Sequence, residues 1–106
     1  MAKYLIQANY VGEGVKGLLK EGGSARRTAV EKLLASVGGK VDSFYYAFGD
    51  TDAYVIVDAP DNVTTAAVAL TVAASGLVTI KTTVLMTPEE VDQATKKSPA
   101  YRAPGA

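Results

Sequence analysis

The chain has 106 residues, of which 48% are hydrophobic and 21% are charged, and this composition suits one soluble domain with a single core. Eleven Lys and Arg residues balance eleven Asp and Glu residues, so no net charge attracts nucleic acid or an anionic membrane surface. The absence of Cys and His excludes disulfides, thiolate and imidazole metal sites, and nucleophilic catalysis that needs a histidine base.

The N-terminal segment predicts a cytoplasmic protein. Gln7 and Asn9 interrupt the apolar residues near the start, so the continuous apolar stretch of a secretory signal is missing. Residues 62–80 carry no charge and approach the length of a membrane span, but Thr and Gly dilute them and Ala dominates. We therefore expect a buried helix followed by a strand there, and no membrane partner.

The first part of the chain predicts a strand, a loop and a helix. Apolar and polar residues mix over residues 3–10, which indicates a strand, and the Gly-rich stretch 11–23 indicates a loop. Ser24 is a candidate N-cap, and Gly38 is a candidate helix end. Between them, apolar residues recur at helical spacing at Val30, Leu33, Leu34 and Val37.

Three further segments predict strands. Residues 40–48 and 52–59 are rich in β-branched and aromatic residues, and only Gly49, Asp50 and Thr51 separate them. This short connection favours an antiparallel pair. Residues 77–86 predict the fourth strand.

Two more helices complete the expected elements. Pro60 and Asp61 begin the second helix, and Gly76 ends it. Its expected packing stripe is Val63, Ala67, Leu70 and Ala74. Thr87-Pro88-Glu89-Glu90 combines a cap, a first-turn Pro and a carboxylate three residues after the cap, which is typical of a short helix running to about Lys97.

The order βαββαβ with a terminal helix predicts an α+β, ferredoxin-like fold with an antiparallel sheet of strand order 4-1-3-2. Residues 1–97 form a single domain in this interpretation, and residues 98–106 form a flexible tail. Both main helices must cover the same sheet face. The third strand carries Tyr54 and Ile56 on one side and Val55 and Val57 on the other.

Neither side of that strand suits water, so we expect a second copy to cover the helix-free face. The chain is then a homo-oligomer in which two sheets pack face to face or close into a barrel.

Several ordered segments of the chain resemble one known family. They are residues 14–23 (GVKGLLKEGG), 30–33 (VEKL), 48–49, 55–61 (VIVDAPD) and 87–90 (TPEE), together with Arg27 and Asp52. These segments are similar to the GYD domain family, small bacterial and archaeal proteins grouped with the dimeric α/β barrels, and the resemblance covers about residues 4–97. The family's Gly-x-Tyr-Asp motif falls on residues 49–52 with Thr51 in place of Tyr, so no role of that phenol carries over. The resemblance implies a ferredoxin-like fold and sheet-to-sheet association, and no general activity.

Polar residues on two strands suggest a ligand site. Gln7 and Asn9 share one face of the first strand, and Lys81 is the only charged residue inside the fourth strand. If all three face a barrel interior they form a polar floor, where a buried lysine needs a partner or a lowered pKa. The alternative is a lysine that reaches solvent at the sheet rim.

Tyr46 and Asp52 extend this candidate site. The adjacent Tyr45 and Tyr46 could line a pocket for an aromatic or quinone-like ligand, although packing in the core or an interface competes with that role. Asp50 and Asp52 could share a proton or hold a hard cation, but turn chemistry explains them more simply. No metal site is expected.

Two other motifs have alternative explanations. Gly12, Gly14 and Gly17 match the G-x-G-x-x-G pattern of dinucleotide loops, but Gly22-Gly23 soon interrupts it and the chain is too short for two mononucleotide-binding halves. No cofactor is therefore expected. Arg26 and Arg27 lie beside a helix N-terminus, where free amide groups could hold a carboxylate or phosphate. An ordinary capped helix with solvated arginines is the alternative.

Two functions fit these observations. The first is a non-enzymatic oligomeric module that binds a small molecule or a partner protein between the sheets. The second is a cofactor-independent enzyme acting on an aromatic or carbonyl compound, in which Asp52, Tyr46 or Lys81 transfers protons. The sequence leaves the ligand, the reaction and any catalytic residues open.

Overall fold

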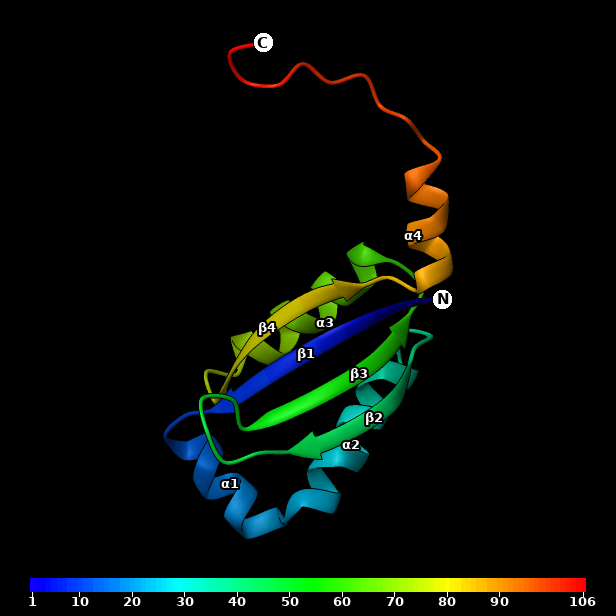
Figure 1. Cartoon of the computed structure of the whole chain (residues 1–106). Coiled ribbons are helices and arrows are strands. Elements are labelled where there is room, and N and C mark those ends of the chain that lie inside the picture. Colours follow the sequence, from blue (N-terminus) through cyan, green and yellow to red (C-terminus); the bar gives the residue numbers. More distant parts are fainter.

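Segments rich in β-branched and aromatic residues form an antiparallel sheet that carries α2 and α3 on one face (Figure 1). The computed structural model describes the whole chain, residues 1–106. Its elements in order are β1 (Ala2–Tyr10), α1 (Glu13–Glu21), α2 (Gly23–Ala35), β2 (Lys40–Tyr46), β3 (Ala53–Ala59), α3 (Asn62–Ala74), β4 (Val78–Leu85) and α4 (Pro88–Thr95).

The four strands lie in the order β2-β3-β1-β4, which is the predicted order read from the other edge. All neighbouring strands are antiparallel, and the ferredoxin-like α+β fold is therefore confirmed. The antiparallel neighbours of β1 also exclude the parallel βαβ unit that a dinucleotide loop requires. No helix is long and apolar enough to cross a membrane.

The glycine-rich segment after β1 is a helix, so the predicted loop was wrong. α1 begins just after Gly12, whose φ of 47° lies in the left-handed region. Gly14 is buried, and a Cβ at that position would lie 2.1 Å from the carbonyl oxygen of Leu77. This glycine thus permits the close packing of α1 on the start of β4, and its presence in the sequence does not mark flexibility.

α2 begins two residues earlier than predicted. Its N-cap is Gly22, with φ 85°, and Ser24 lies inside the first turn, where its carbonyl oxygen accepts a hydrogen bond from the Thr28 hydroxyl at 3.1 Å. The Ser24 cap is therefore incorrect. Gly22 separates α1 from α2 and allows the chain to turn between them, because a glycine adopts this backbone conformation without steric cost.

α3 packs through a different stripe from the predicted one. Thr65 and Val68 are buried, whereas Val63 and Leu70 are 80% and 72% exposed. Since α3 has no charged residue, its sequence pattern does not distinguish a solvent face.

Local hydrogen bonds hold α3 in its observed rotation. The Asp61 carboxylate accepts from the Thr64 N–H at 2.8 Å, the Thr65 hydroxyl donates to the Asp61 carbonyl at 3.0 Å, and the Tyr4 hydroxyl donates to Asn62 at 2.6 Å. These contacts satisfy the polar groups of the helix start and allow Thr65 to be buried.

The core lies between the sheet and the helices. Tyr4, Leu34 and Val57 are the largest fully buried side chains, and they come from β1, α2 and β3 in turn. The opposite face of the sheet carries no helix (Figure 1).

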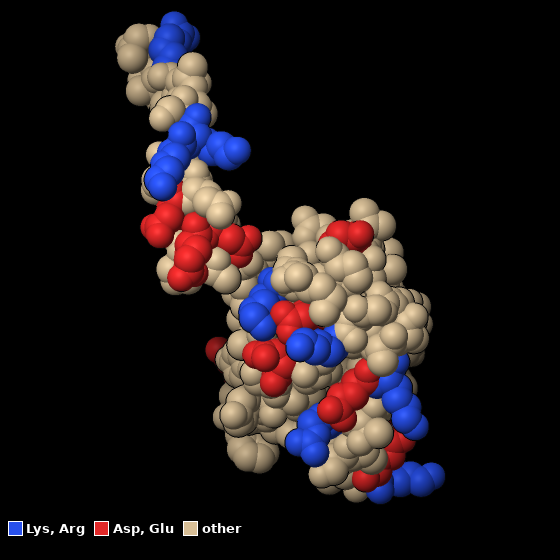
Figure 2. Space-filling model, turned by 90° about the vertical axis from the view of Figure 1, so that its right-hand side faces the viewer, with Lys and Arg blue, Asp and Glu red and all other residues tan.

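α4 extends away from the rest of the molecule (Figure 2). It begins with the predicted capping box, in which Thr87 and Glu90 bond each other's backbone amides at 3.1 and 2.9 Å. The helix has no buried residue. Acidic side chains lie near its start and basic ones beyond its end (Figure 2), which complements the helix dipole.

Candidate functional site

The helix-free face of the sheet has an apolar middle and polar ends. The strand register pairs Leu5 with Ile56 and Gln7 with Tyr54, and these four side chains alternate with the core-facing residues of the same strands. Leu5 and Ile56 are half-buried, and Tyr54 is 42% exposed. An apolar patch thus lies across β1 and β3 with no other element over it.

Gln7, Asn9 and Lys81 share this open face. Gln7 is the register partner of Lys81 on β4, and Asn9 is the partner of Thr79. The structure therefore brings the three predicted residues to one end of the open face. Lys81 is exposed in the single chain, so its side chain reaches solvent unless another molecule covers it.

Asp52 lies next to Asn9 and ties the β2–β3 connection to β1. Its carboxylate accepts from the Tyr10 backbone N–H at 2.9 Å, and its own N–H donates to the Asn9 side chain at 2.9 Å. The Thr51 hydroxyl contacts the Gln7 amide oxygen at 3.3 Å. These bonds fix the loop at the polar end of the open face, and they occupy one oxygen of Asp52.

Tyr46 lies apart from Gln7, Asn9 and Lys81, although it lines one pocket together with Asp52. Its neighbour in the register is Ala53, a core residue, so its ring is on the helix side of the sheet, 5.1 Å from the ring of Phe44. The Tyr46 hydroxyl donates to the Gly23 carbonyl at 3.0 Å. Partial burial, assisted by Tyr10, raises the pKa of Tyr46 to about 12. The five predicted residues therefore do not form one cluster.

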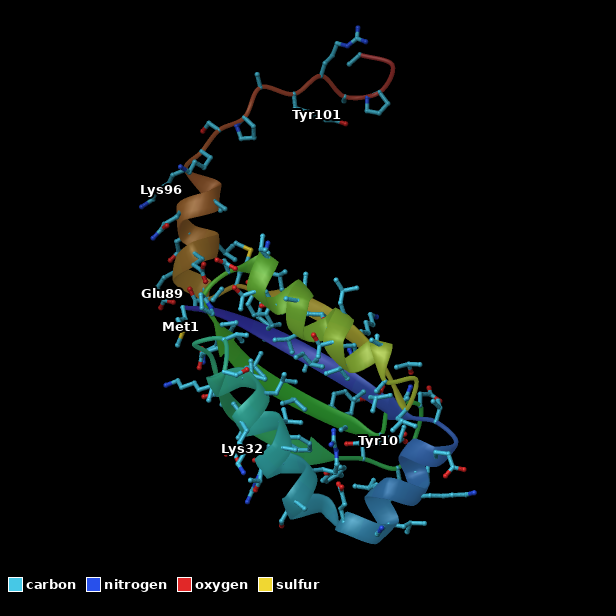
Figure 3. All side chains as sticks on the ribbon, turned by 180° about the vertical axis from the view of Figure 1, so that it is seen from behind. Met1, Tyr10, Lys32, Glu89, Lys96 and Tyr101 are labelled. Carbon is cyan, nitrogen blue, oxygen red and sulfur yellow. The ribbon has the colours of Figure 1, made fainter.

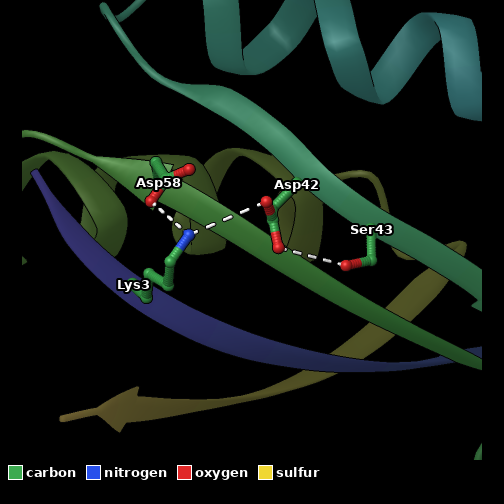
Figure 4. Close-up of polar contacts among 4 residues, drawn as sticks. All are labelled: Lys3, Asp42, Ser43 and Asp58. Atoms are coloured by element: carbon green, nitrogen blue, oxygen red, sulfur yellow. Dashed lines mark hydrogen bonds and ion pairs between the residues drawn. The ribbon is translucent and has the colours of Figure 1, made fainter. Parts of the chain in front are cut away.

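A charged cluster that the sequence analysis missed lies at the other end of the open face (Figure 4). Lys3 donates to Asp58 at 2.9 Å and lies 3.7 Å from Asp42, while the Ser43 hydroxyl donates to Asp42 at 3.2 Å. Asp58 is only 7% exposed. Its hydrogen bond raises the pKa of Lys3, and the charge of Asp42 adds to this effect.

The signal for this cluster was present in the alternation of the strands. Lys3 precedes Leu5 by two residues, and Asp58 follows Ile56 by two, so both belong to the open face. Their pairing depends on the strand register, which the sequence pattern does not supply. The open face thus offers an apolar centre with hydrogen-bonding groups at one end and an ion-pair cluster at the other. No group of three metal-ligating side chains lies together anywhere in the structure.

The chain was compared with known protein families, curated proteins and solved structures. The model of the GYD domain matches residues 4–95, which include all four helices and all four strands apart from the first two residues of β1. No curated protein and no solved structure matches the chain. Because the family model covers most of its length, the chain belongs to the GYD domain family.

Proposed function

We propose that this GYD domain protein is a self-associating module that binds a small molecule between two facing sheets. The observation that carries the proposal is the uncovered apolar patch of Leu5, Tyr54 and Ile56 on the helix-free face. When helices bury one side of a sheet, the second side can face water if its residues are polar. An apolar second side is stable when another surface covers it. Here the centre of the helix-free face is apolar, which favours its burial against a second copy of the chain.

The polar residues around this patch support a ligand site in the same place. Gln7 lies between Tyr54 and Lys81 in the strand register, so an amide and, one strand further, an ammonium group adjoin the apolar patch. A pocket with apolar walls and a few directed polar groups is the usual form of a small-molecule site. The ammonium of Lys81 favours a ligand that carries an anionic or carbonyl oxygen.

Self-association can be tested with Tyr54→Glu. Tyr54 is 42% exposed, which is about 80 Å² if the whole surface of a tyrosine is about 200 Å². Its burial contributes about 2 kcal/mol per copy, hence about 4 kcal/mol in a two-fold dimer, where both copies carry the change. The dissociation constant of the dimer should therefore rise about 1,000-fold.

Sedimentation equilibrium measures this effect, and Val63→Glu is the matched control. Val63 is 80% exposed and lies on α3, away from the open face, so its replacement should leave the dimer intact. A wild-type chain that stays monomeric at every concentration would refute self-association.

Ligand binding between the sheets can be tested by native mass spectrometry of the purified protein. We expect a retained small molecule that is lost in Lys81→Met and kept in Lys32→Met, which removes an exposed lysine on α2. Unchanged retention in Lys81→Met would remove Lys81 from the site.

A further inference from the structure

The helix side of the sheet contains an apolar cleft. α2 packs chiefly on β2, whereas α3 packs on β4 and β3, so the two helices diverge over the middle of the sheet (Figure 3). The space between them is about 160 Å³. A dry apolar cavity of about 150 Å³ can accommodate one benzene ring, so the cleft has room for a small ring or a short chain.

Hydrophobic residues line this cleft almost completely. Fourteen of its fifteen lining residues are hydrophobic, and the exception is Arg26. The sheet contributes Ile6, Val55 and Ile80, and α3 contributes Val72. One positive charge thus lies at an otherwise apolar site.

Arg26 has an unsatisfied donor at this position. Its Nε is buried and has no hydrogen-bond partner, and its guanidinium forms no ion pair. Glu13 and Glu21 line the neighbouring cavity with Arg26, but Glu13 pairs with Lys16 at 3.1 Å. Native proteins rarely leave a buried donor unpaired, and a group that remains so calls for an explanation.

We propose that the cleft binds a small apolar monocarboxylate, whose ring or chain lies among the apolar side chains and whose carboxylate accepts hydrogen bonds from Arg26. A neutral hydrocarbon would fill the volume and leave the Nε unpaired. A phosphate monoester or dicarboxylate would bring a second negative charge into an apolar wall that has nothing to neutralise it. One guanidinium and one carboxylate match in charge and geometry.

This site is distinct from the proposed space between sheets. Ile6 and Val55 point to the helix side, while Leu5 and Ile56 point to the open face. The two proposals therefore stand or fall independently, since association through the open face leaves α2 and α3 uncovered.

The three isoleucines of the chain allow a direct test with benzoate as the probe. Ile6 and Ile80 line the cleft, and Ile56 lies on the open face. In methyl NMR spectra of isoleucine-labelled protein, we expect benzoate to shift the signals of Ile6 and Ile80 and to leave Ile56 unchanged. Shifts of Ile56 alone would overturn the cleft proposal and favour a ligand between the sheets.

Two matched variants test the role of Arg26. Arg26→Gln should weaken benzoate binding roughly 10- to 100-fold, the usual effect of losing a charge-assisted hydrogen bond. Arg27→Gln makes the same change one residue along α2, at an exposed position outside the cleft, and should change the affinity less than about twofold, in line with the small effect of exposed charges.

Uncharged benzamide, which has nearly the same shape, should bind the wild type about as weakly as benzoate binds Arg26→Gln. Equal affinity for benzamide and benzoate, equal losses in the two arginine variants, or no binding of benzoate at millimolar concentration would each overturn the proposal.

Discussion

Replacing Gly14 by Ala should destabilise the protein, although alanine is the better helix former. A Cβ at position 14 would lie 2.1 Å from the Leu77 carbonyl oxygen and 2.9 Å from the Leu77 carbonyl carbon, so α1 must move away from the start of β4 by more than about 1 Å to reach ordinary contact. That movement also weakens the hydrogen bond from the Val11 N–H to the same oxygen, now 3.0 Å long.

The magnitude follows from three terms. Overpacking costs about 1–3 kcal/mol and loss of the hydrogen bond about 1 kcal/mol, while the gain in helix propensity is about 1 kcal/mol. We expect a net loss of about 1–3 kcal/mol for Gly14→Ala. Gly17 lies in the same helix with no atom within 4 Å of a Cβ, so Gly17→Ala should stabilise the protein by up to about 1 kcal/mol.

Thermal and urea unfolding followed by circular dichroism measure the difference between these variants. One kcal/mol shifts the Tm of a domain of this size by about 4–8 °C, so a difference of about 1–4 kcal/mol between the two variants corresponds to at least about 4 °C. A Gly14→Ala protein that is as stable as Gly17→Ala would refute the close packing of α1 on β4.

Two further predictions concern groups with shifted pKa values. Tyr46→Phe should remove the last phenol to ionise in an ultraviolet pH titration, because the folded pKa of Tyr46 is about 12 and the ordinary value is 10.0. As pH rises through this interval, Tyr46 loses its proton in the unfolded chain before it does so in the folded chain. The wild type should therefore lose more stability than the variant over the same interval. Lys3→Met should lower the Tm more than Lys32→Met, because it leaves the buried Asp58 without its cation. The raised pKa of Lys3 means that this stabilisation is fully present below the ordinary lysine value of 10.5 and is lost as pH rises through the folded value, so the melting curves of wild type and Lys3→Met should converge in strong alkali.

The strands and their order were predictable because β-branched and aromatic residues mark them and few topologies connect βαββαβ. α1 was missed because Gly14 resembles a loop residue, while its actual role depends on the Leu77 backbone, 63 positions away. The packing face of α3 was misassigned because an uncharged helix has no polar side to exclude.

The candidate site was predictable only in part. Alternation along the first strand placed Gln7 and Asn9 on one face, whereas the common face of Lys81 follows from its register with Gln7. The pairing of Lys3 with the buried Asp58 requires the strand register, and the unpaired Nε of Arg26 requires the three-dimensional arrangement of α2 and the sheet. Sequence patterns indicate faces, whereas partners across elements come from the tertiary structure.

α4 differs from the other helices in what holds it together. It has eight residues and none is buried, so its stability comes from its capping box, its backbone bonds and the hydrogen bond from the Thr95 hydroxyl to the Asp92 carbonyl. Helices of this length are marginal by themselves in water. Its amide hydrogens should therefore exchange with deuterium at rates near those of an unfolded peptide, while those of β1 and β3 exchange only on global opening. The chain thus combines one cooperatively unfolding unit with an appendage that opens without it.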